Sequence, residues 1–131
     1  MKDLTKKWLD YAEENLASAG VLLDSRLFNP CLQNTQQAVE KMLKALLVEA
    51  GIKVKKTHSI RELKGILTRL DVKVPITEDE MDLLDSIYLP SKYPLGNVLP
   101  DFEPDQSICE RCIAVAEVAR DFVRELVGQD Q

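Results

Sequence analysis

Apolar residues recur at three- and four-residue steps over residues 4–23 and again over residues 30–51. This spacing is typical of amphipathic helices, because it places the apolar side chains on one face. Asn29 and Pro30 fit the start of the second segment as a capping side chain followed by proline at the first helical position. Gly51 fits its end. The pattern therefore predicts two long helices.

The second predicted helix carries a polar stripe in addition to its apolar stripe. Gln33, Gln37, Glu40 and Lys44 follow one another at helical spacing. Such a stripe faces either water or a binding site. Long polar side chains on a helix are ordinarily exposed. We therefore favour solvent exposure for Gln37, Lys41 and Lys44, with a polar cleft as the alternative.

Two capping boxes mark the starts of two shorter helices. Residues 59–62 and 77–80 each combine Ser or Thr with Glu three positions later, so that each side chain satisfies a free backbone N–H of the other. These motifs predict helices over about residues 60–70 and 78–89, joined by an extended connection.

A long irregular segment and a final helix complete the chain. Proline at 90, 94 and 100 predicts a loop over residues 90–103, and Pro104 fits the start of the last helix. The apolar face of residues 108–127 is wide, which favours a two-fold dimer interface. The alternative is that the neighbouring helices enclose this face. The predicted fold is all-α, a single domain over residues 1–131 that forms an antiparallel up-and-down bundle.

Composition narrows the possible functions. With 17 basic and 22 acidic residues and a net charge of −5, the molecule as a whole should repel nucleic-acid phosphates, so that any RNA contact must be local. No membrane-spanning or signal segment is evident, and we expect a cytoplasmic protein. The three cysteines include the pair Cys109 and Cys112. With no second pair they cannot complete a zinc site, so we expect reduced core thiols, no metal and no cofactor.

Several segments together resemble the HEPN domain family. The similarity rests on Trp8, Ala12, Leu16 and Ala19, on the run 36–47, on Thr57, His58, Ser59 and Ile60, and on Tyr88, Ser91, Lys92, Tyr93 and Pro94. The resemblance implies a bundle of four long helices with one additional short helix. It also implies a homodimer and a protein partner, a minimal nucleotidyltransferase, often as a toxin–antitoxin pair.

Many members of that family are metal-independent ribonucleases with an arginine four to six positions before a histidine. The only histidine here is His58, and no arginine stands at Ile52, Lys53 or Val54. A general acid or base is needed to move protons at the attacking and leaving oxygens. We therefore expect no catalytic activity. The alternative is a variant ribonuclease that uses Lys53, His58 and Lys92. Without that role, His58 is expected to form hydrogen bonds at the helix start.

The resemblance also implies a tyrosine-centred site for a nucleotide or RNA. Tyr88, Lys92 and Tyr93 supply two rings and a charge that can stack a base and hold a phosphate. Lys41, Lys44 and Gln37 complete the predicted site if the polar stripe faces it. The alternative is that the tyrosine rings are buried by packing while their hydroxyl groups contact water. A basic cluster of Lys53, Lys55, Lys56 and Arg61 is either a solvated turn or a phosphate-contact patch at a helix N-terminus.

Overall fold

The computed structural model describes residues 1–54, 56–92 and 103–128. In these ranges the chain forms five α-helices and no strand: α1 (Asp3–Asp24), α2 (Phe28–Glu49), α3 (Ile60–Arg69), α4 (Glu78–Lys92) and α5 (Gln106–Gly128). The predicted all-α bundle is confirmed. α1, α2 and α5 are its three long helices, and α3 and α4 are the shorter ones.

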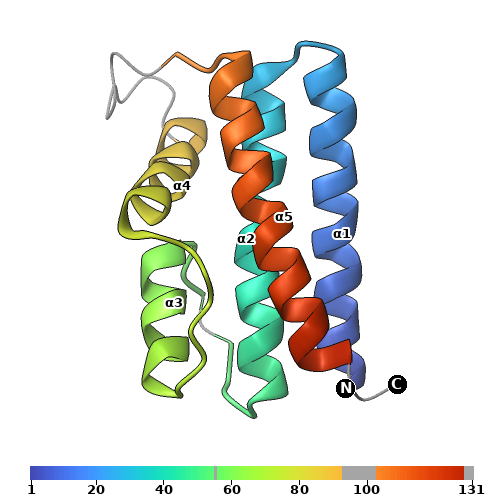
Figure 1. Ribbon diagram of the computed structural model, residues 1–131, viewed down its shortest axis with the longest axis vertical. Helices are drawn as coiled ribbons and strands as arrows, with labels where there is room; N and C mark the ends of the chain where they lie inside the picture. The colour runs from blue at the N-terminus through green and yellow to red at the C-terminus, as the bar shows by residue number, and fades with distance from the viewer. Residues whose placement is uncertain (55, 93–102, 129–131) are drawn as a thin grey trace.

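Helix α2 lies at the centre of the bundle and contacts each of the other four helices. Figure 1 shows α1 on one side of α2, with α3 and α4 one above the other on the opposite side. Leu32, Leu43 and Leu47 of α2 are fully buried. The apolar stripe of α2 therefore forms the middle of a single core.

Of the two predicted capping boxes, the one at α4 forms in full and the one at α3 forms in part, because the backbone N–H of Ser59 donates to Thr57 Oγ1 at 3.1 Å and not to Glu62. Thr77 and Glu80 cap each other, with N–H to oxygen distances of 2.8 and 3.2 Å, as predicted. Ser59 Oγ accepts from the backbone N–H of Glu62 at 3.1 Å. The first residues of α3 and α4 therefore lie where the local sequence predicts them.

The predicted starts of α2 and α5 are wrong by two residues. α2 begins at Phe28 with no side-chain cap, and Asn29 Oδ1 instead accepts from Gln33 Nε2 at 3.3 Å. Pro30 is accommodated because the first backbone N–H groups of a helix need no intrahelical acceptor. α5 begins at Gln106 rather than at Pro104, and Asp105 Oδ1 caps the N–H of Ile108 at 2.8 Å.

All three cysteines are free and fully buried. Burial raises the pKa of Cys31, and it raises those of Cys109 and Cys112 to about 12, because the buried thiolate loses its hydration. The prediction of core thiols is confirmed. No helix in the described part of the chain has the length and apolar character to cross a membrane.

Candidate functional site

Part of the polar surface of α2 is buried. The exposed fractions of Gln36, Glu40 and Lys44 are 0%, 3% and 5%. Gln37 and Lys41 are half-buried. The preferred expectation of solvent exposure is therefore wrong for Lys44, which other helices cover. Buried polar groups of this kind require partners, because an unpaired charge in a low-dielectric interior is strongly unfavourable.

Glu40 is the centre of a polar cluster. Its carboxylate accepts from Lys44 Nζ at 2.9 Å and lies 3.1 Å from His58 Nδ1. Longer contacts of 3.4 and 3.5 Å come from the side-chain amides of Gln36 and Gln37. We call these five residues the Glu40 cluster. It places a lysine, a histidine and two amides around one buried carboxylate.

The ring of His58 is fixed on two sides. Nδ1 faces Glu40, and the ring stacks on Tyr88 with a centroid separation of 4.4 Å and an interplanar angle of 15°. A carboxylate only accepts hydrogen bonds, so Nδ1 carries a proton, and in a neutral ring the lone pair is left on Nε2. The prediction that His58 bonds within the helix start is wrong for the ring, whose partner is on α2. The His58 backbone carbonyl accepts from Gln36 Nε2 at 3.1 Å.

A cavity of about 270 Å³ adjoins this stack. His58, Ser59, Asp85 and Tyr88 line it. Two of the four residues are aromatic rings and one is a carboxylate, so the cavity combines a stacking surface with a hydrogen-bond acceptor. Such a combination suits a planar, polar group such as a nucleobase.

Asp85 occupies the N-terminus of α3. Its carboxylate accepts from Ser59 Oγ at 3.1 Å and from the backbone N–H groups of Ile60 and Arg61 at 2.6 and 3.3 Å. These are the groups that would otherwise bind a phosphate at a helix N-terminus. The start of α3 is therefore not open to a phosphate, as the phosphate-patch alternative required, because a carboxylate of the chain itself accepts from these groups.

The basic cluster around this turn does not converge. The guanidinium of Arg61 pairs with Glu78 and Asp82, which raises its pKa. Lys53 and Lys56 are exposed, and Lys55 lies outside the described residues. The structure therefore supports the solvated-turn interpretation for the described members of this cluster.

The remaining predicted residues divide between two sides of α2. Lys41 Nζ donates to Asn15 Oδ1 at 2.7 Å and lies 5.8 Å from the centre of the Tyr11 ring. It therefore faces α1, whereas His58 and Tyr88 lie on the α3 and α4 side. Lys44 lies 5.7 Å from the centre of the Trp8 ring and also contacts Glu40, so it connects the two sides.

Two predicted residues cannot be placed. Lys92 is the last residue of α4, but its side chain lies outside the described part of the chain, and so does all of Tyr93. Of the tyrosine-centred group, only Tyr88 is therefore located. Its ring contacts the ring of His58, although all of α3 and most of α4 separate the two residues in the sequence.

Sequence reasoning missed Glu40 and Gln36 as members of the site. A weak signal was present, because Glu40 precedes Lys44 by four positions, which is the spacing of a helical ion pair. The same spacing occurs in exposed pairs, so spacing alone did not reveal burial.

The HEPN domain model matches residues 5–126, which is almost the whole chain. The chain belongs to the HEPN domain family. Solved structures with similar folds agree with this assignment. The crystal structure of TT1696 from Thermus thermophilus matches with a TM-score of 0.76 and 28% identity, over 95% of this chain and 98% of the other.

Two further relatives extend this picture. The crystal structure of ST0689, an archaeal HEPN homologue, matches with a TM-score of 0.63 and 25% identity, over 96% of this chain and 98% of the other. The Methanocaldococcus jannaschii protein named Putative toxin MJ1304 is 26% identical, over 96% of this chain and 92% of its own length. These relatives and this HEPN domain are therefore similar over nearly their full lengths.

Proposed function

We propose that this HEPN domain is a toxin–antitoxin-type module that forms a homodimer, pairs with a minimal nucleotidyltransferase, and binds a nucleotide or RNA beside Tyr88. Membership of the HEPN family and the toxin name of its M. jannaschii relative support the general class. The nucleotide site is the part of the proposal for which the structure offers geometry.

The Glu40 cluster with the His58–Tyr88 stack carries the proposal. A buried carboxylate holds the imidazole in place, and the imidazole holds the phenol ring at the edge of a 270 Å³ cavity. A preorganised aromatic surface loses little conformational entropy when a base stacks on it. Gln37, together with Lys92 and Tyr93, whose side chains lie outside the described part, is proposed to contact the ligand. Lys41 faces α1 and Lys44 is buried against Glu40, so neither is proposed as a ligand contact.

Titration with ATP tests this site. In Tyr88→Ala the dissociation constant should rise about 10- to 100-fold, because stacking on an aromatic ring contributes on the order of 1–3 kcal/mol per base. Tyr88→Phe keeps the ring and should bind nearly as wild type. Isothermal titration calorimetry measures both. Equal affinity for ATP in wild type and Tyr88→Ala would remove the proposed site.

A second candidate function is a metal-independent ribonuclease with a variant active site. The observation that favours it is the Glu40–His58 contact, which fixes the ring and leaves Nε2 as a candidate base. Lys53 and Lys92 would supply charge in place of the missing arginine. Incubation with single-stranded RNA separates the two functions. Cleavage that disappears in both His58→Ala and Lys53→Ala would favour the ribonuclease, whereas intact RNA with the wild-type protein would exclude it.

The homodimer is supported by apolar side chains left on the surface of α5. Val118 and Leu126 are 51% and 50% exposed, and half-buried Phe122 lies between them at helical spacing. Three apolar residues at i, i+4 and i+8 form a narrow stripe that a second copy could cover. The rest of the wide apolar face of α5 packs inside the subunit, as the alternative predicted. For the second proposed partner, a minimal nucleotidyltransferase, co-purification of the two proteins is the direct measurement.

A further inference from the structure

A second and larger cavity lies between the first half of α1 and the last half of α5. Its volume is about 630 Å³, which falls within the range of about 300–1,000 Å³ typical of small-molecule sites. It shares no residue with the Glu40 cluster or with the cavity beside Tyr88. Any ligand bound there would therefore be distinct from the proposed nucleotide.

The floor of this cavity is apolar. Leu9 of α1, Met42 of α2 and Val123 and Val127 of α5 form it. Met42, Val123 and Val127 belong to the core and are no more than 4% exposed. Leu9 is the half-buried member of this floor, and none of the four side chains has a polar group with which water could form a hydrogen bond. An apolar chain is the kind of group that such a surface binds.

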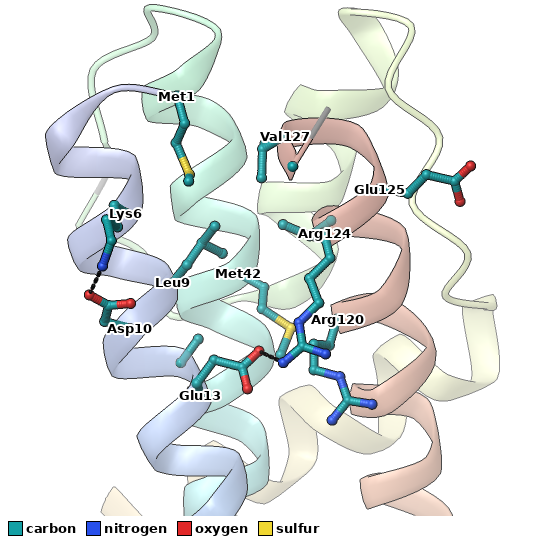
Figure 2. Close-up of a pocket in the computed structure, with 13 residues that line it drawn as sticks. Met1, Lys6, Leu9, Asp10, Glu13, Met42, Arg120, Arg124, Glu125 and Val127 are labelled. Carbon is teal, nitrogen blue, oxygen red and sulfur yellow. Dashed lines mark hydrogen bonds and ion pairs between the residues drawn. The ribbon is translucent and has the colours of Figure 1, made fainter. Parts of the chain in front are cut away.

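Charged side chains surround the mouth, and most are already paired. Lys6 Nζ contacts Asp10 at 2.9 Å, and Arg124 Nη2 contacts Glu13 at 2.9 Å. Figure 2 shows both pairs at the edge of the cavity. The charges of these four residues cancel.

Arg120 is the basic residue of the lining whose guanidinium is only partly paired. Its Nε contacts Asp121 at 3.2 Å, outside the cavity lining, and its terminal Nη groups have no hydrogen-bond partner within the described part of the chain. The side chain is only 25% exposed. Figure 2 shows the guanidinium of Arg120 near that of Arg124, while Glu125 points away from the cavity. The mouth therefore presents two guanidinium groups. Glu13 pairs with Arg124 and Asp121 pairs with the Nε of Arg120, which leaves the terminal Nη groups of Arg120 for an anion.

We propose that this cavity binds an amphiphile with an apolar chain and a single anionic head, a carboxylate or a phosphate. The chain lies on Leu9, Met42 and the valines of α5, and the head accepts hydrogen bonds from Arg120 with support from Arg124. A planar guanidinium matches the two oxygens of either head. The proposal does not depend on the nucleotide site.

Four probes with ten-carbon chains test the proposed chemistry: decanoate, decyl phosphate, decanol and decyltrimethylammonium. Decanoate and decyl phosphate should bind roughly tenfold more tightly than decanol, because each makes charge-assisted hydrogen bonds. Decyltrimethylammonium should bind more weakly than decanol. Comparison of decanoate with decyl phosphate identifies the preferred head. Octanoate should bind about 15-fold more weakly than decanoate, as burial of each methylene contributes about fourfold.

The signals of the three methionines can report where a probe binds. Met1 and Met42 line the cavity, whereas Met81 is buried on α4 and does not. In spectra of the protein with isotopically labelled methionine methyl groups, the signals of Met1 and Met42 should move on titration and that of Met81 should stay. Shifts of all three signals, or of Met81 alone, would contradict a specific site.

Two variants separate the head from the chain. Arg120→Gln should reduce the affinity for decanoate to that for decanol, and Arg111→Gln, an exposed arginine on the same helix outside the cavity, should leave it unchanged. Leu9→Trp, at a half-buried position, should fill the cavity and weaken all four probes. Circular dichroism establishes that each variant is folded. Equal affinity for decanoate and decanol in the folded wild type, or no binding of either, would overturn the proposal.

Discussion

Glu40 shows how one buried carboxylate organises the candidate site. It is 3% exposed, and its charge is compensated by Lys44 and by the hydrogen bond from His58. Removal of charges from water is so costly that a buried pair adds little net stability. The pair instead fixes geometry, because each donor around Glu40 has a defined position.

Lys44→Met should destabilise the protein by about 3–5 kcal/mol, because it leaves Glu40 buried without its ammonium partner. The double variant Lys44→Met with Glu40→Gln should recover part of this loss. The matched control is Lys6→Met, which breaks the pair of Lys6 with Asp10 at the same helical spacing. Both side chains of that pair are more than half exposed, so its loss should cost under about 1 kcal/mol. Urea denaturation measures all three, and equal losses for Lys44→Met and Lys6→Met would contradict the assigned role.

The same comparison explains what the sequence could not reveal about the site. Glu40 and Lys44 have the four-residue spacing that Lys6 and Asp10 also have, and only the first pair is buried. The difference comes from Trp8 and His58, which approach α2 from elements far away in the chain. Tyr88 and His58 were individually identified, but their contact depends on how α3 and α4 pack. Local patterns carry no information about such packing.

At the scale of helices, Asp85 links α4 to α3. Its carboxylate accepts three hydrogen bonds at the start of α3, where the helix dipole also favours a negative charge. His58 and Ser59 lie at this helix start and line the cavity beside Tyr88. By fixing the helix start, Asp85 also fixes the position of these two lining residues.

Asp85→Ala should destabilise the protein by about 1–2 kcal/mol, the usual cost of losing a helix cap, and should expose the first N–H groups of α3. The control is Asp82→Ala, one turn earlier on α4, which removes only an exposed contact to Arg61. Hydrogen exchange should accelerate at Ile60 and Arg61 in Asp85→Ala and stay near wild type in Asp82→Ala. Unchanged exchange at both amides in Asp85→Ala would show that the cap is not needed.

The elements themselves follow closely from local sequence. Thr77 and Glu80 form the predicted reciprocal cap, because both partners lie within one turn. The start of α2 does not follow, since Pro30 is tolerated at any of the first helical positions and thus does not specify one of them. Distant partners such as Asp85 for α3 have no local signature. The sequence therefore predicts where helices occur better than what holds their ends.

At the scale of the whole molecule, α5 is one of the helices whose apolar residues the subunit does not fully cover. Ala116, Ala119 and Val123 are buried against the bundle. Val118 and Leu126 remain half exposed, with Phe122 between them. In a two-fold dimer the same stripe meets itself, so every substitution in it changes the interface twice.

Leu126→Glu should therefore weaken the proposed homodimer strongly. A well-packed residue buried in an interface contributes about 2 kcal/mol or more, roughly 30-fold in affinity for each of the two copies, and each introduced carboxylate would also be left in an apolar surface. The control is Val21→Glu, which places the same charge at a position of α1 that is 66% exposed and lies outside the stripe. Sedimentation equilibrium at micromolar concentration should find dimers for wild type and Val21→Glu and monomers for Leu126→Glu. A monomeric wild type would remove the dimer, and a dimer that survives Leu126→Glu but not Val21→Glu would move the interface from α5 to α1.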